Sequence, residues 1–143
     1  MNEIRNFKAL LKTALTDSLP AQITAHADDA GITLSAPSVK TGYANPFQEV
    51  DQFPEIRIFE VRKKGYERQI RKHVLGVRLF VVVQSDDAED EADVMSEAIG
   101  ATVEDMPGSN GIYDVDGLTI GVFLGPPDVK QMAVGTIDFD VLL

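Results

Sequence analysis

Residues 74–84 constrain the fold of this chain more than any other stretch. The odd-numbered positions of this segment are Leu75, Val77, Leu79, Val81 and Val83, so one face of an extended chain would be entirely apolar. The even-numbered positions include Phe80 and Val82, so from Leu79 onward both faces are apolar. A strand covered by other elements on both sides has this composition. We therefore expect a long strand, running to about Gln84, in the middle of a sheet.

A second strand is expected immediately before it. From Glu55 the sequence alternates, with Ile56 and Ile58 on one face and Phe59 and Val61 on the other. The polar stretch RKKGYERQIRK separates the two strands, and Gly65 marks the expected turn. The pair predicts a β-hairpin with a buried root and a basic, projecting tip near residues 63–72.

Two amphipathic helices are predicted. Residues 4–18 carry apolar side chains at helical spacing, with Asn2 as the expected N-cap and Pro20 as the expected stop. Residues 21–30 could add one helical turn that ends at Gly31. The other helix follows a cap among residues 85–87 and ends near Gly100 or continues to Glu104; its apolar stripe consists of Ala88, Ala92, Met95 and Ile99.

The rest of the chain predicts short strands and one long irregular segment. Residues 32–34 could form a short strand, and the Pro- and Gly-containing segment that follows it has no clear period. Strands are expected over residues 112–115 and 118–124, with Asp116-Gly117 as a hairpin turn between them. A last strand, over about 129–142, alternates like a half-buried edge strand.

This order of elements predicts a single α+β domain over residues 1–143. We expect a mainly antiparallel sheet of about four to five strands, two helices packed on one face, and a projecting β-hairpin. The chain contains no cysteine and no apolar run near the ~20 residues that a membrane-spanning helix needs. Disulfides and thiolate metal sites are therefore excluded, and no membrane association is expected.

Charge is sorted along the chain. Residues 54–78 carry eight Lys and Arg against three acids, whereas residues 85–116 carry eleven acids and no Lys or Arg. The whole chain has a net charge of −10, which argues against specific nucleic-acid binding. A molecule with one basic and one acidic region can attract copies of itself. The alternative is that both regions are solvated faces that only confer solubility.

The sequence shows no catalytic constellation. His26 lies beside Asp28 and Asp29, a set that could hold a metal ion in an enzyme but is more typical of an exposed helix end. The acidic run DDAEDEADVMSE lacks the central Gly and the alternating oxygen ligands of a calcium loop. Ser109 has no base partner in the pattern around it. We expect no enzyme activity, no metal site and no cofactor.

The order of segments resembles a family. The segments are ALTDSLP, FPEIRIFEVRKKG, HVLGVRLFVVV, DDAEDEADVMSEAI and MAVGTIDFDVLL. Together they resemble the tail-terminator and tail-completion proteins (minor tail and neck proteins) of long-tailed bacteriophages. The resemblance covers the layout of nearly the whole chain and includes no diagnostic motif.

The resemblance implies a structural protein of a phage or prophage virion. Such a protein forms a ring, a hexamer, that caps the tail tube and joins it to the head or neck. Its partners would be copies of itself, the tail-tube protein and neck or head-completion proteins, and DNA would pass through the ring without specific binding. It would reside in the virion tail, and in the host cytoplasm during assembly.

The residues themselves suggest how such copies would contact one another. In a ring each subunit presents one face to a different face of its neighbour. The predicted contact joins the basic hairpin to the acidic helix. The hairpin residues are Arg62, Lys63, Lys64, Arg68, Arg71 and Lys72, and the helix residues are Asp87, Glu89, Asp90, Glu91, Asp93 and Glu97. A different function remains open, that of a small acidic protein-binding adaptor domain unrelated to phage.

Overall fold

A computed structural model describes residues 3–42, 45–46, 49–50, 52–69, 72–108, 111–126 and 131–143. Its elements are the helices α1 (Glu3–Asp17), α2 (Leu19–Ala30) and α3 (Ala88–Glu104), and the strands β1 (Ser38–Thr41), β2 (Glu55–Glu67), β3 (Lys72–Gln84), β4 (Asp114–Leu124) and β5 (Met132–Leu142). The five strands form one sheet in the order β1-β2-β3-β5-β4.

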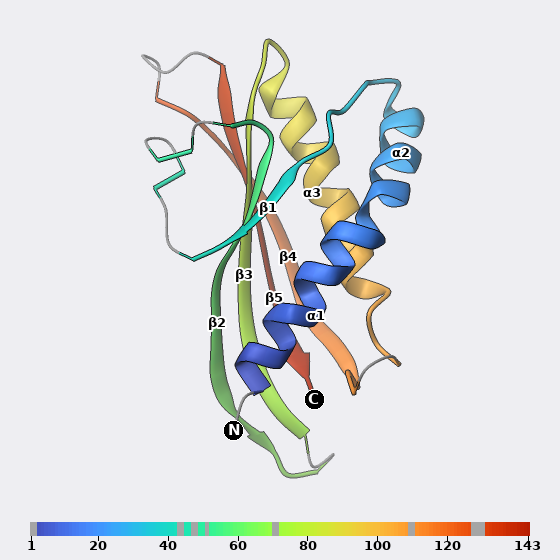
Figure 1. The fold of residues 1–143 in the computed structure, drawn as a ribbon, viewed down its shortest axis with the longest axis vertical. Coiled ribbons are helices and arrows are strands. Elements are labelled where there is room, and N and C mark those ends of the chain that lie inside the picture. Colours follow the sequence, from blue (N-terminus) through green and yellow to red (C-terminus); the bar gives the residue numbers. More distant parts are fainter. Residues whose placement is uncertain are drawn as a thin grey trace.

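The fold is α+β, as expected, but the sheet is mixed and three helices are present. β1 runs parallel to β2, whereas the other neighbouring strands are antiparallel. All three helices lie on one face of the sheet (Figure 1). The third helix arises because α2 begins directly after Ser18, with Pro20 in its first turn. A proline there removes no helical hydrogen bond, so Pro20 helps to start a helix and does not end one.

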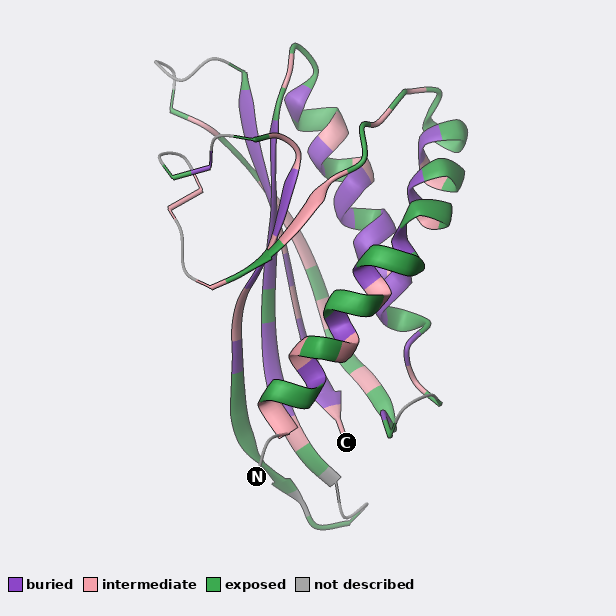
Figure 2. Cartoon of the chain, viewed as in Figure 1, coloured by how far each residue is buried: buried purple, intermediate pink, exposed green. Residues whose placement is uncertain are grey.

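β3 lies at the centre of the sheet, and its two faces confirm the prediction from the sequence. Its odd-numbered side chains join the main core beneath the helices, where Leu75, Leu79 and Val81 are fully buried. Phe80 and Val82 lie on the opposite face, in a smaller cluster with Val50, Met132 and Val134. Purple, buried residues accordingly run along the middle of the sheet (Figure 2).

Three shifts in strand register explain errors of the sequence prediction. The register of β2 against β3 shifts between Ile58 and Glu60, so Phe59 is an extra residue on β2. Val61 consequently pairs with Val77 and joins Ile56 and Ile58 in the main core, not Phe59 on the other face. Because an inserted residue reverses the alternation of the strand, residues after the bulge change sides.

The second error concerns Asp116-Gly117. This dipeptide lies within β4, at a register shift between Asp116 and Thr119, and is not a hairpin turn. Gly117 has a φ of 65°, which suits a bulge as well as a turn. Gly65, the expected turn of the hairpin, likewise lies at a bulge within β2. The strand continues past it, and the chain reverses between Glu67 and Lys72.

Other predictions were also wrong in part. Residues 32–37 form no strand, and the strand in this region is β1. β5 alternates as expected, with Ile137 and Val141 buried, but it lies between β3 and β4 and is not an edge strand. The expected cap Asn2 lies outside the described residues. No helix in the described part of the chain has the length and apolarity needed to cross a bilayer.

Close packing between α3 and the sheet depends on a glycine in β5. A Cβ atom placed on Gly135 would lie 1.9 Å from the Ser96 hydroxyl oxygen and 3.1 Å from a methyl carbon of Val81. Ser96 is fully buried and donates to the Ala92 carbonyl of its own helix at 2.6 Å. The absent side chain at Gly135 therefore lets the helix approach the middle of the sheet.

We expect Gly135→Ala to lower the free energy of unfolding by about 1–3 kcal/mol, because the added methyl group overpacks this contact. Ser96→Ala in the same chain removes the clashing oxygen and should restore part of the loss. Urea unfolding of the two single variants and the double variant measures the effect. A strictly additive double variant would contradict the contact.

Candidate assembly interface

The basic tip and the start of the acidic helix lie at opposite ends of the molecule. β3 begins at the hairpin tip and runs along the long axis, and α3 starts just beyond its other end (Figure 1). β3 has 13 residues. At about 3.3 Å per residue, a strand of that length spans roughly 40 Å. The hairpin therefore separates the two charged regions by most of the length of the protein.

The hairpin cations are exposed, but several of them pair within the chain. Arg62 contacts Glu60 at 2.7 Å, Lys63 contacts Glu3 of α1 at 3.4 Å, and Lys64 contacts Asp140 of β5 at 3.0 Å. The Arg62–Glu60 and Lys64–Asp140 pairs reach solvent on both sides, and such pairs contribute only about 0–1 kcal/mol each, whereas the side chain of Glu3 is only 18% exposed. The internal ion pairs of Arg62 and Lys64 can therefore be broken at a small cost in free energy, which allows these cations to pair with carboxylates of another molecule.

Lys64 reaches β5 by crossing β3 at a glycine. A Cβ atom on Gly76 would lie 2.9 Å from Lys64 Cδ, so the lysine stem occupies the space that a side chain would take. Gly76 is opposite Asp140 in the register of β3 and β5. Next to this pair, Arg78 donates from Nε to Asp138 at 2.9 Å, which raises the pKa of the guanidinium. Cross-strand ion pairs thus line the sheet face away from the helices, in the half of the sheet nearer the hairpin tip.

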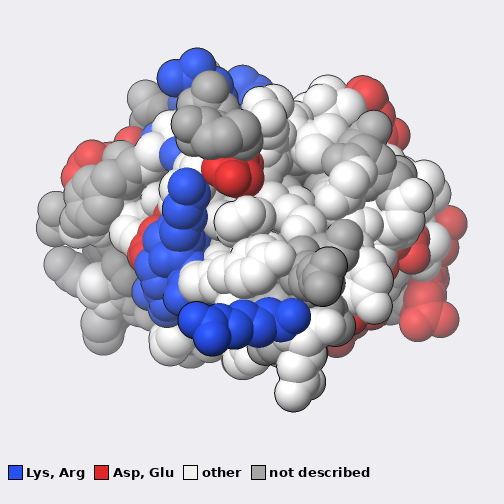
Figure 3. All heavy atoms as spheres, turned by 90° about the horizontal axis from the view of Figure 1, so that it is seen from below, with Lys and Arg blue, Asp and Glu red and all other residues white. Residues whose placement is uncertain are grey.

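The remaining predicted hairpin residues differ in their surroundings. Arg68 is exposed and has no ion pair with the described residues. Arg71 lies outside the described residues, as does the side chain of Lys72. His73 is exposed and contacts the Tyr66 ring edge-on, with 5.0 Å between ring centroids. Seen from this end, Lys and Arg gather over one part of the surface, and acids lie on both sides of them, with more on the right (Figure 3).

Glu3 joins the hairpin to the first turn of α1. A backbone hydrogen bond at Glu3 is the main cause that lowers the pKa of its carboxyl, and the nearby Lys63 and His73 lower it further. The carboxylate therefore stays charged beside the tip throughout the neutral range.

The acids of α3 lack such partners. Asp87 forms the N-cap without a side-chain capping bond, and Glu91 accepts a hydrogen bond from the Ser85 hydroxyl. No described Lys or Arg makes an ion pair with any acid of this helix. The exposed residues among the predicted set are Asp87, Glu89, Asp90, Asp93 and Glu97. The acidic surface is therefore available to cations from elsewhere.

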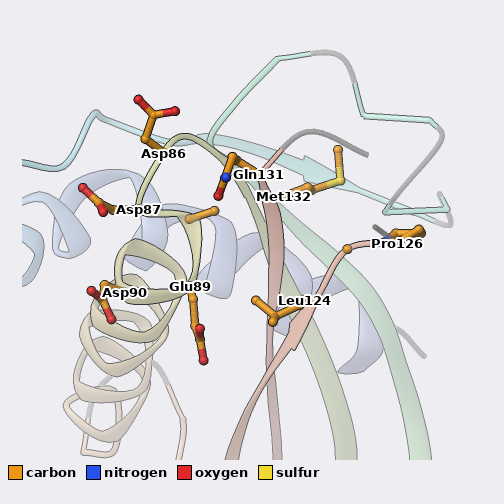
Figure 4. A pocket seen from close by; sticks show the side chains of 10 residues that line it. Asp86, Asp87, Glu89, Asp90, Leu124, Pro126, Gln131 and Met132 are labelled. Atoms are coloured by element: carbon orange, nitrogen blue, oxygen red, sulfur yellow. The ribbon is translucent and has the colours of Figure 1, made fainter. Parts of the chain in front are cut away.

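A groove lies at the start of α3 that the sequence did not predict. It encloses about 490 Å³ between the first turn of the helix and the end of β4. Asp86, Asp87, Glu89 and Asp90 line one side, and Leu124, Pro126 and Met132 line the other (Figure 4). Leu124 is 64% exposed. The sequence placed this leucine in a strand, but the approach of the strand end to α3 depends on the order of β5 and β4.

His26, with its neighbours Asp28 and Asp29, forms no metal site in the described part of the chain. His26 lies in α2 and contacts the Gln22 carbonyl of the same helix through Nδ1 at 2.8 Å. Within the described ranges, no group of three His, Asp or Glu residues could hold a metal ion. Ser109 lies outside the described residues.

No protein-family model matches this chain, and no curated protein sequence matches it significantly. Function is therefore inferred from the residues and their arrangement.

The pair between Lys64 and Asp140 should contribute little to the fold. In a double-mutant cycle of Lys64→Ala and Asp140→Ala, we expect a coupling energy of about 0.2–1 kcal/mol, because both side chains reach solvent. Urea unfolding of the dilute protein measures it. A coupling energy above about 2 kcal/mol would mean that this lysine is a structural residue and is not available for an intermolecular contact.

Proposed function

We propose that this protein is a structural subunit that assembles into a closed ring, in which the basic hairpin of one copy contacts the acidic helix of the next. The observation that carries the proposal is that α3, whose exposed carboxylates are unpaired within the described chain, begins at the end of the molecule opposite the hairpin. Two different surfaces of each copy then meet, and such a contact closes into a ring when the rotation between neighbours allows it.

The setting comes from the resemblance to phage tail-terminator and tail-completion proteins. In that setting the ring would be a hexamer that caps the tail tube and contacts neck or head-completion proteins. The net charge of −10 would favour passage of DNA without specific binding, because like charges repel phosphate. The protein would act in the virion tail, after assembly in the host cytoplasm, and would carry out no chemical reaction.

A second function is favoured by the groove at the start of α3. Its acidic wall and its apolar wall, with Leu124 exposed, would suit a short cationic peptide from another protein. In that case the protein would be an acidic adaptor domain, and its own hairpin would have no role in binding.

A charge swap separates these functions. In one variant Lys63, Lys64 and Arg68 become Glu, and in a second variant Glu89, Asp93 and Glu97 become Lys. Each variant alone should stay monomeric in light scattering after size-exclusion chromatography at low salt, because its two surfaces then repel each other. An equimolar mixture should assemble, since each reversed surface meets its complement on the other variant.

Circular dichroism provides the folding control for both variants. We expect native spectra, because the exchanged residues are exposed. Unfolding of the hairpin variant would show that its cations are structural. A wild-type protein that is monomeric at every salt and protein concentration, with or without tail-tube protein, would refute the ring and favour the adaptor.

A further inference from the structure

The outer edge of β4 is unusual for a soluble protein. β4 ends the strand order, and β5 is the one described strand that pairs with it. Its segment Thr119–Leu124 (TIGVFL) contains no charge and no proline, and Phe123 and Leu124 are 58% and 64% exposed. Natural edge strands are usually protected by lysine, proline or a bulge, because free edges pair with other chains. The bulge of β4 precedes this segment and leaves it regular.

The backbone of this segment offers hydrogen bonds to a further strand. The Gly125 N–H donates to the Met132 carbonyl on β5 at 2.7 Å. Successive residues of an antiparallel strand direct their N–H and C=O groups to opposite sides. Ile120, Val122 and Leu124 therefore point these groups away from β5, toward a side where the described residues place no strand.

Carboxylates of α3 flank this edge. A Cβ atom on Gly100 would lie 3.1 Å from Ile120 Cδ1 and 3.3 Å from Leu118 Cδ2, so this side of the helix borders β4. Glu89, Asp93 and Glu97 are spaced at helical intervals from Gly100 and share its side of the helix. A strand added to β4 would therefore lie beside a row of unpaired acids.

The opposite side of the sheet carries a free edge of opposite charge. β1 covers β2 only along Glu55–Ile58, and no described strand lies beside the rest of β2. His73 and Leu143 exchange N–H to carbonyl hydrogen bonds at 3.2 and 2.9 Å, so the odd-numbered residues of β3 direct their backbone groups away from β2. The even-numbered residues of β3 therefore direct their N–H and C=O groups toward β2. The β2 residues that form hydrogen bonds with them include Glu60 and Arg62. The backbone N–H and C=O groups of Val61 and Lys63 therefore point outward, away from β3.

We propose that the free edge of β4 pairs with the Glu60–Lys63 edge of β2 from a second copy, so that one sheet continues into the next. This inference rests on the proposed function and names the backbone contact within the ring. The added strand would place Arg62, Lys63 and Lys64 near the acids of α3. A second β4 is the poorer occupant, because it would bring two rows of α3 carboxylates together.

Amide hydrogen exchange on the unmodified protein tests the pairing. The monomer at high salt is compared with the assembly at low salt, after correction for intrinsic rates. Exchange at Ile120, Val122, Val61 and Lys63 should slow by at least about tenfold in the assembly, because their N–H groups become bonded. The amide N–H groups of Gly121 and Phe123 point toward β5 and serve as controls that are protected in both states.

Each other outcome overturns the inference. Protection of Ile120 and Val122 without protection of Val61 and Lys63 would identify another occupant of the β4 edge. An assembly that forms while all four amides stay unprotected would refute strand addition and leave the proposed ring in place. A protein that never assembles, and shows no protection, would refute both.

Val122→Pro and its control Val122→Thr provide a second test. The Val122 N–H makes no bond within the sheet, so proline at this edge position blocks an added strand and preserves the pairing with β5. Threonine keeps both the N–H and the shape of valine. We expect Val122→Pro to be monomeric and Val122→Thr to assemble. Assembly of a folded Val122→Pro protein like the wild type would contradict the inference, and if that variant unfolds the exchange measurement decides.

Discussion

The burial of β3 on both faces determines the arrangement of the other elements. An apolar face of a strand is stable only when another layer covers it, and β3 has two such faces. The helices cover one of them, and its side chains from Leu75 to Val83 are buried. The other is covered near its upper end by Val50, Phe53 and Phe59, from the segment around the start of β2. Beyond that cover, residues of the same face must be polar, and there Arg78 pairs with Asp138.

The polarity of the molecule follows from chain connectivity. A hairpin that extends past the core must carry soluble side chains at its tip, and here these are mostly cations. The chain then returns along the full length of β3 before α3 begins, and the first turn of that helix is acidic. Acids suit this position, because the N-terminal end of a helix carries a partial positive charge. Local requirements at two distant places thus produce a dipolar protein.

Glu55 differs from the exposed acids of α3. This carboxylate is buried and holds Lys40 and Arg57 in a structural cluster, at 3.1 and 2.9 Å.

Local patterns predicted the elements better than their relationships. The faces of β3, the start of α3 and the antiparallel pairing of β2 with β3 were correct, because each depends on the periodicity of one segment, but the turn of the hairpin was wrongly placed at Gly65. Val61 was placed on the wrong face because the bulge at Phe59 is defined by the pairing of β2 with β3. Asp116-Gly117 has the composition of a turn, and only the register with β5 shows that the strand continues. The charged residues of the candidate interface were visible in the sequence. Their internal partners Glu3 and Asp140, and the free edge of β4, required the strand order.

The ends of the chain provide a further consequence. Leu143 is hydrogen-bonded to His73 next to the hairpin tip, and Glu3 contacts Lys63 nearby. Figure 1 shows the two described ends of the chain, the start of α1 and the end after β5, at the same pole of the molecule. A fluorescent label or affinity tag fused at either end would therefore emerge beside the hairpin. Such fusions could obstruct association with other molecules there, so a failed binding experiment with a tagged protein should be repeated after the tag has been removed.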